Sequence, residues 1–83
     1  MTDEPTMNRM LSFEWNEKSE VIEIHADRKG LEFLAEQLLA LLASEENDHV
    51  HLMTAEWGGE ELSSDPQNSA SVLVNHVKVL KWK

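Results

Sequence analysis

Apolar and polar positions alternate in two short segments near the N-terminus, residues 10–15 and 21–25. A period of two is typical of half-buried strands, and the polar residues 16–19 between them are typical of a turn. In the first segment Ser12 and Glu14 fall on the polar side. The positions expected to face the core are Leu11, Phe13, Trp15, Ile22 and Ile24. These segments predict an antiparallel hairpin.

The spacing then changes to that of a helix. Asp27 is predicted to be its N-cap, because its carboxylate can accept the free backbone N–H groups of the first turn. The helix is expected over residues 28–43, with an apolar stripe at Leu31, Leu34, Leu38, Leu41 and Leu42. Phe33 projects away from this stripe. We expect the N-terminal arm or a loop to cover Phe33, or else Phe33 to belong to a binding surface.

Two further strands are predicted in the second half of the chain. Residues 49–53 place Val50 and Leu52 on one face, and His49, His51 and Met53 on the other. Residues 54–70 contain loop signals, and long loops are either functional or disordered. Residues 72–82 are rich in β-branched side chains and form the last predicted strand. Its alternation changes near residues 77–80, which predicts a bulge there.

The predicted order is β-β-α-β-β within one domain, residues 1–83. We therefore expect an α+β fold with a four-stranded, mainly antiparallel sheet and one helix packed on one face. Residues 1–6 are polar and are expected to form a frayed arm. The second face of the sheet, carrying His49 and His51, is expected to stay open to water or to a partner.

Charge narrows the range of functions. Among 83 residues the acidic side chains outnumber the basic ones, 16 to 7, which gives a formal net charge of −9. Such an excess repels nucleic acids and anionic membranes and favours basic protein partners, although a solvated surface is the simpler interpretation. There is no cysteine, no stretch resembling a membrane span, and no basic and apolar leader at the N-terminus. We expect a cytoplasmic protein.

The candidates for catalysis and metal binding are weak. His49 and His51 share a strand face, and His76 or His25 would be a third ligand if its strand is adjacent. The alternative is a pair of half-exposed histidines that pack against their neighbours. Ser63 lies in ordinary polar loop composition and lacks the setting of an activated nucleophile. We therefore predict no enzyme activity, no metal and no cofactor.

The segment 56–62 is the most distinctive in the chain. Trp57 lies between acids and beside two glycines that permit unusual backbone angles. Tryptophan is enriched among the residues that dominate binding energy at interfaces. The alternative is that Trp57 folds back and plugs the edge of the core. Trp15 and Trp82 are expected in the core or at a sheet edge.

The run His49–Met53, followed by Glu56–Gly59 and Leu62, resembles immunity protein family 32 of bacterial polymorphic toxin systems. Gly30-Leu31, the leucine-rich helix and the valine-rich last strand also fit, so the resemblance covers about residues 20–83. It implies a small cytoplasmic protein that binds a cognate toxin domain and protects the cell that makes it. Acidity suits a toxin with a basic active site, such as a nuclease.

The leading hypothesis is a toxin-neutralising protein with an acidic surface anchored by tryptophan. Its predicted partner-binding residues are His49, His51, Glu56, Trp57, Glu60, Glu61 and Asp65. A second hypothesis is a module that binds a metal or small ligand through His49 and His51. A third is a domain that associates with itself through the open sheet face or Phe33.

Overall fold

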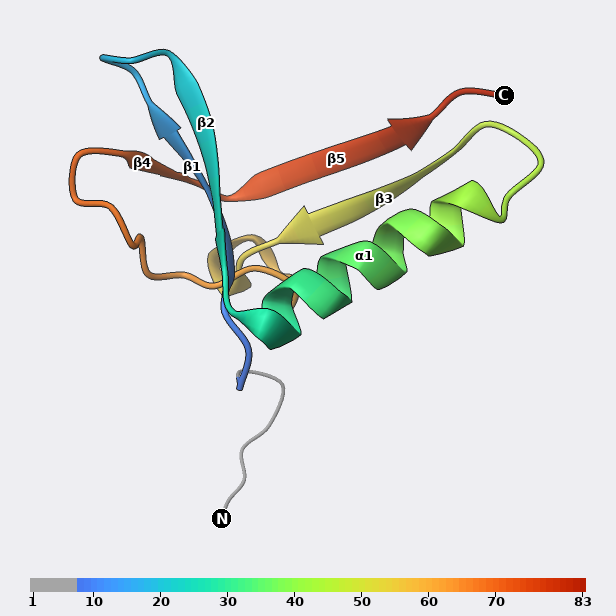
Figure 1. Ribbon diagram of the computed structural model, residues 1–83, viewed down its shortest axis with the longest axis horizontal. Helices are drawn as coiled ribbons and strands as arrows, with labels where there is room; N and C mark the ends of the chain where they lie inside the picture. The colour runs from blue at the N-terminus through green and yellow to red at the C-terminus, as the bar shows by residue number, and fades with distance from the viewer. Residues whose placement is uncertain (1–7) are drawn as a thin grey trace.

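The computed structural model describes residues 8–83, so the arm expected at residues 1–6 lies outside the described part (Figure 1). The elements are β1 (Leu11–Asn16), β2 (Val21–Ala26), α1 (Arg28–Leu42), β3 (Asp48–Met53), the 3₁₀ helix η1 (Ala55–Trp57), β4 (Val72–Val74) and β5 (His76–Lys81). The α+β class, the antiparallel pairing and the single long helix are as predicted.

The strands form two sheets and not the single four-stranded sheet that was predicted. One sheet has the order β2-β1-β4 and the other pairs β3 with β5, all antiparallel. The predicted last strand divides at Asn75, whose main-chain and side-chain oxygens accept hydrogen bonds from Thr54 at 3.0 and 2.8 Å. The bulge expected at residues 77–80 is absent, because β5 pairs in continuous register.

Asp27 caps α1 as predicted. Its Oδ1 accepts hydrogen bonds from the backbone N–H groups of Gly30, at 2.7 Å, and of Met10, at 3.1 Å. The N–H of Gly30, followed by that of Met10, lowers the pKa of the Asp27 carboxyl. A side chain at Gly30 would collide with the Met10 carbonyl oxygen. The cap and the glycine therefore fix the start of the helix against the chain entering β1.

The core is small and lies where the two sheets meet. Its buried cluster contains Leu11, Phe13, Leu52 and Leu62, and partly buried side chains such as Leu34 and Val77 pack around it. Phe33 also packs against this cluster. The Arg9 guanidinium lies 3.8 Å from the centre of the Phe33 ring, a cation–π contact from the segment before β1. Arg9 and the core cluster thus cover Phe33, whereas the N-terminal arm named in that expectation lies outside the described residues.

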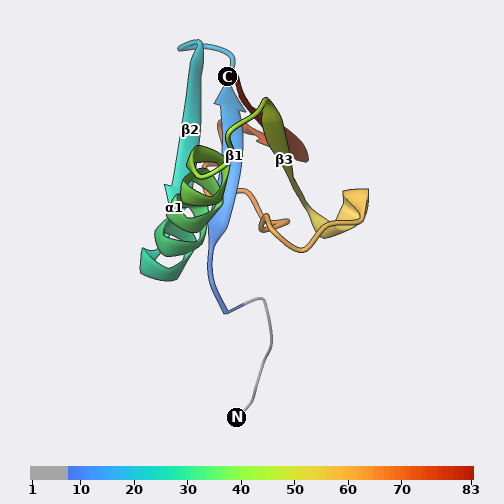
Figure 2. The same cartoon turned by 90° about the vertical axis from the view of Figure 1, so that its right-hand side faces the viewer.

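Several residues expected in the core are exposed, and two expected at the surface are buried. Trp15, Ile22 and Ile24 of the hairpin, and Leu31, Leu38 and Leu42 of α1, are all exposed. Trp82 is also exposed, beyond the end of β5. Conversely, Ser12 and Glu14 are fully buried. Ser12 and Glu14 are buried because the chain between η1 and β4 runs past β1, as Figure 2 shows.

Candidate partner-binding site

A tight turn after β3 holds Trp57 outward. Ala55–Trp57 form a single 3₁₀ turn, and the next residue, Gly58, has a left-handed φ of 90°. The Gly58 N–H donates to the Ala55 carbonyl oxygen at 2.9 Å, which closes the turn. Glycine adopts this conformation without steric cost. Trp57 remains 58% exposed, so the alternative that it plugs the core is wrong.

Gly59 and Leu62 fasten the other end of the turn to the strand. The Gly59 N–H donates to the Thr54 carbonyl at 3.0 Å, and the Leu62 N–H donates to the Met53 carbonyl at 3.1 Å. A Cβ at Gly59 would lie 2.5 Å from that Met53 oxygen, so a larger residue does not fit. Leu62 is 1% exposed and joins the core. Trp57 is thus presented on a fixed support, which reduces the entropy lost on binding.

Three histidines lie beside this turn on the outer face of β3 and β5. The ring centres of His49 and His51 are 5.0 Å apart, as are those of His51 and His76. The Nδ1 of His51 lies 2.7 Å from the Nε2 of His76. The Trp57 ring centre is 5.9 Å from that of His76. A continuous aromatic surface therefore runs from β3 across β5 to the turn.

The His51 ring, in the middle of this surface, is shifted toward its uncharged form. Burial, followed by the nearby positive charges of His49, His76 and Lys78, lowers the pKa of the His51 ring below its ordinary value. The lowered pKa favours the uncharged form of His51 at neutral pH. Because the Nδ1 of His51 already contacts His76, the Nε2 of the His51 ring is the nitrogen that remains for a hydrogen bond to a partner.

The acids of the turn fall into two groups. The Glu56 carboxylate has its pKa lowered by its own backbone N–H and then by the Ser64 hydroxyl, 2.9 Å away. The Glu56 and Glu60 side chains are exposed. The Oε1 of Glu61 instead accepts hydrogen bonds from the backbone N–H groups of Met53, at 3.0 Å, and Glu60, at 3.3 Å. Glu61 therefore holds the turn together, whereas Glu56 and Glu60 are available to a partner.

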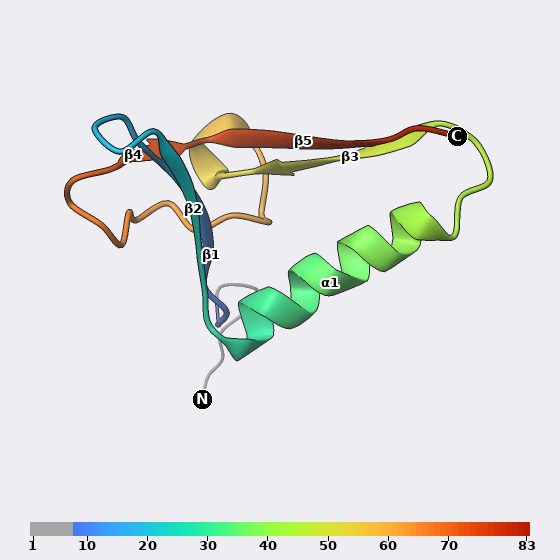
Figure 3. The ribbon, with the colours of Figure 1, turned by 45° about the horizontal axis from the view of Figure 1, so that its top comes forward.

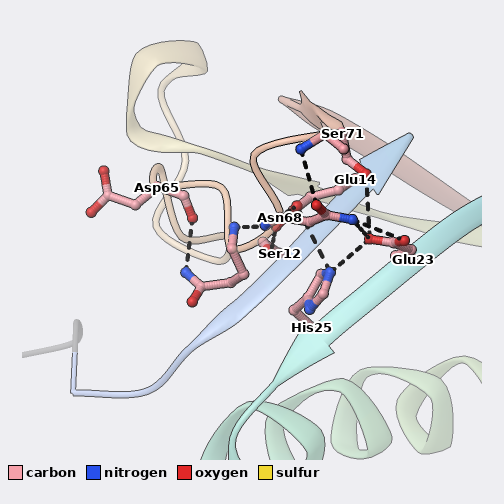
Figure 4. Close-up of polar contacts among 9 residues, drawn as sticks. Ser12, Glu14, Glu23, His25, Asp65, Asn68 and Ser71 are labelled. Atoms are coloured by element: carbon pink, nitrogen blue, oxygen red, sulfur yellow. Dashed lines mark hydrogen bonds and ion pairs between the residues drawn. The ribbon is translucent and has the colours of Figure 1, made fainter. Parts of the chain in front are cut away.

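Figure 4 shows a second polar cluster, centred on Glu14, which the sequence analysis did not predict. Glu14 is fully buried and accepts hydrogen bonds from the Ser12 hydroxyl, at 2.7 Å, and from the backbone N–H groups of Gln67 and Asn68, at 2.8 and 3.0 Å. Burial raises the pKa of Glu14, but these hydrogen bonds outweigh it and lower the pKa overall. Glu14 thus fastens the loop before β4 to β1.

Two neighbours on β2 extend this cluster. The Nε2 of His25 lies 2.9 Å from a Glu23 oxygen, and the Asn68 amide donates to both Glu23 oxygens at 3.1 and 3.2 Å. The ligand atoms of Glu14, Glu23 and His25 lie close enough together to hold a metal ion. Both Glu14 oxygens, however, already accept hydrogen bonds from the chain. The hydrogen bonds from Gln67 and Asn68 to Glu14 and Glu23 explain this cluster as a clamp that holds the loop before β4.

A small hollow lies at the far end of the histidine face. It has a volume of about 180 Å³ and is lined by Asn47, Asp48, His49, Leu80, Lys81 and Trp82. Pockets for small molecules are usually about 300–1,000 Å³. The size of this hollow does not favour the hypothesis of a small-ligand module.

Residues 21–77 match the family model described as immunity protein 32. The chain belongs to this family. The matched segment runs from β2 into β5, so it includes the Trp57 turn and the histidine face, and the resemblance inferred from the sequence is confirmed. No curated protein and no solved structure gives a significant match. Within residues 8–83, no helix has the length and apolar character needed to cross a membrane.

The structure of this family member gathers most of the predicted binding residues, but not all. His49, His51 and Trp57 form one surface, with Glu56 and Glu60 in the same turn. Asp65 lies in the separate loop held by Glu14, and Figure 4 shows its carboxylate pointing away from that cluster. His76 joins the surface, although its sequence context suggested only a third metal ligand. Strand pairing brings His76 next to Met53, which sequence spacing alone does not show.

Proposed function

We propose that this immunity protein neutralises a bacterial protein toxin by binding it through the surface around Trp57. The observation that carries the proposal is an exposed tryptophan on a rigid turn, packed beside three histidines and flanked by acids. Exposed apolar surface with a polar rim is typical of the central residues that dominate protein–protein binding. Catalysis is not required for this activity, and inhibition follows from binding alone.

Each group has a separate role in this proposal. Trp57 inserts into the toxin as the apolar anchor, because its ring is more than half exposed. Glu56 and Glu60 pair with lysine or arginine at the rim. The neutral ring of His51 supplies hydrogen bonds at the centre. Glu61 acts indirectly, because its carboxylate supports the turn.

The net charge of −9 indicates what kind of toxin the surface fits. A toxin that acts on nucleic acid carries basic residues in its active site to hold phosphate. Acidic side chains on the immunity protein would speed encounter with such a site and exclude acidic competitors. We therefore propose a basic toxin domain, such as a nuclease, as the partner, and the cytoplasm of the toxin-producing cell as the place of action.

The direct test starts with capture of the partner from the source bacterium and its identification by mass spectrometry. The captured domain is then expressed in a heterologous host with and without the immunity protein. We expect the domain to stop growth when expressed alone, and co-expression to restore growth. A captured domain that is harmless, or that remains toxic during co-expression, would contradict the proposal.

The metal-binding alternative uses the same histidines and has its own test. The three rings of His49, His51 and His76 lie on one sheet face, but their ligand nitrogens do not all lie close enough together for one ion; within residues 8–83 only Glu14, Glu23 and His25 do. Metal analysis of protein purified without a histidine tag separates the two hypotheses. A stoichiometric ion would favour the metal module, and a metal-free protein that binds the toxin would support immunity function.

A further inference from the structure

A second exposed apolar surface lies away from the Trp57 turn, on the β1–β2 hairpin and on α1. It consists of six large side chains, each between 36 and 71% exposed: Trp15, Ile22, Ile24, Leu31, Leu38 and Leu42. We call these six residues the apolar face. None of them is charged, although acids are abundant elsewhere in the chain.

The hairpin half of the apolar face continues the surface that packs in the core. In the β1–β2 register, Trp15 lies opposite Ile22 and Phe13 lies opposite Ile24, so all four share one face of the sheet. Phe13 belongs to the buried cluster, whereas Trp15 and Ile22 lie nearer the hairpin tip and Ile24 lies on the edge strand β2, and all three are exposed. Figures 1 and 3 show why: α1 starts near the base of the hairpin and diverges from it.

The helix half of the apolar face has the spacing of a helix-packing seam. Leu31, Ala35, Leu38 and Leu42 recur at intervals of four, three and four residues, the a/d pattern of coiled coils. At 3.6 residues per turn this seam is rotated by roughly 60–80° from Leu34, which packs on the core. Helix α1 therefore has one side packed on its own fold and a second apolar side whose leucines remain 46–71% exposed.

The exposed area approaches what one partner of a standard interface buries. With about 200 Å² for a fully exposed large apolar side chain, the six residues present roughly 650 Å². The largest apolar patch on a typical monomer is about 300–600 Å². A standard interface buries about 800 Å² on each partner. A small core without disulfides also leaves this chain in need of added burial.

We propose that the apolar face joins two copies of this chain in a symmetric dimer, with the two α1 helices packed antiparallel. In a two-fold pair centred between Ala35 and Leu38, Leu31 of each copy meets Leu42 of the other. The small side chain of Ala35 allows the helices to approach closely. Ile22 and Ile24 of each hairpin then cover the flank of the partner helix.

Charge favours a second copy over the toxin as the occupant of this face. Antiparallel packing brings the basic first turn, with Arg28, toward the acidic segment after the partner helix, with Glu45 and Glu46. Glu32 and Glu36 lie outside the seam and stay in water. A basic toxin would gain no ion pair from an uncharged face. The acidic Trp57 surface, on other elements, remains free in the dimer.

The first test is the mass of the full, untagged protein in solution, measured by analytical ultracentrifugation from micromolar to sub-millimolar concentration. The chain has a mass of 9.5 kDa, and we expect twice that value. Added salt should leave the dimer intact, because the buried face is apolar and salt screens only the ion pairs at its ends. A strict monomer across the range would overturn the proposal, including a monomer that forms a one-to-one toxin complex through this face.

A matched pair of substitutions tests which face is used. Leu38→Glu places a charge in the centre of the seam, and Leu80→Glu places one on the histidine face of β5. The two leucines are similarly exposed, at 46 and 52%. We expect Leu38→Glu to give a monomer and Leu80→Glu to remain a dimer. The opposite result, or a dimer with both changes, would overturn the proposed interface.

Cysteine cross-linking keeps the test valid if Leu38→Glu fails to fold. The chain has no cysteine, so a single introduced thiol reports only its own position. Ala35→Cys lies in the seam, whereas Ala40→Cys lies on a different side of α1, and both alanines are exposed. A short bis-maleimide should link two copies through Ala35→Cys but not through Ala40→Cys. Equal linkage from both positions, or from neither, would contradict the antiparallel dimer.

Discussion

The Nδ1 of His51 and the Nε2 of His76 lie 2.7 Å apart between the paired strands β3 and β5. One nitrogen must donate its proton and the other must accept it, so at least one of the two rings is neutral. Burial is the largest cause of the lowered pKa of His51, followed by the positive charges of His49, His76 and Lys78. The contact therefore makes the stability of the histidine face depend on pH.

The sign of this dependence follows from the direction of the pKa shift. The pKa of His51 is lower in the folded chain than its ordinary value of about 6.5, so the unfolded chain takes up the proton more readily. The stabilisation is complete above about pH 6.5 and is lost as the pH falls through the folded value. In urea unfolding at about pH 7.5 and pH 5, we expect wild type to lose more stability than His51→Gln. Equal losses in the two proteins would contradict this role.

Glu14 provides a second test, because its buried carboxylate accepts three hydrogen bonds. In Glu14→Gln the amide nitrogen replaces an acceptor and faces backbone N–H donors of the loop. We expect a loss of about 2–3 kcal/mol in the free energy of unfolding, measured by urea denaturation. Because the pKa of Glu14 is lowered, this stabilisation is present above about pH 4.5 and is lost as the pH falls further.

The matched control for Glu14 is Glu17→Gln. Glu17 is exposed in the turn between β1 and β2, and the substitution makes the same change in charge. We expect its free energy of unfolding to stay within about 0.5 kcal/mol of wild type. Similar losses at both positions would mean that net charge, and not the loop clamp, sets the effect.

Charge reversal tests the acidic rim around Trp57. Glu60→Lys and Glu36→Lys change the net charge equally, but Glu60 lies in the Trp57 turn and Glu36 on the exposed side of α1. We expect Glu60→Lys to weaken toxin binding about tenfold, with slower association and a smaller salt dependence. Glu36→Lys should stay within about threefold of wild type. Equal effects would indicate long-range steering without a contact at Glu60.

The local elements were predictable because their signals are local. Alternation defined the hairpin, and the carboxylate of Asp27 at the head of a leucine-rich segment defined the helix start. The division of the last strand at Asn75 was not predictable, because it depends on hydrogen bonds to Thr54, 21 residues away. The two-sheet arrangement follows from that division.

The site was predictable only where its residues lie close together in the sequence. Trp57 and the two glycines form a local turn, so their sequence pattern was informative. His76 reaches the site through strand pairing, and Glu14 becomes buried because a loop more than 50 residues later covers it. The leucine positions showed that α1 is apolar but not which leucines face its own core. That choice depends on how the helix is oriented on the sheets.

The most direct test of the toxin-binding surface is a pair of tryptophan substitutions. Trp57→Ala removes the proposed anchor, while Trp82→Ala removes a ring that is more exposed, at 76%, and that borders only the far end of the histidine face. Affinity for the captured toxin domain is measured by calorimetry, and circular dichroism confirms that both variants fold. We expect Trp57→Ala to raise the Kd by about 30-fold or more, which corresponds to about 2 kcal/mol, and Trp82→Ala to change it by less than about threefold. Wild-type affinity in folded Trp57→Ala would contradict the proposed binding surface.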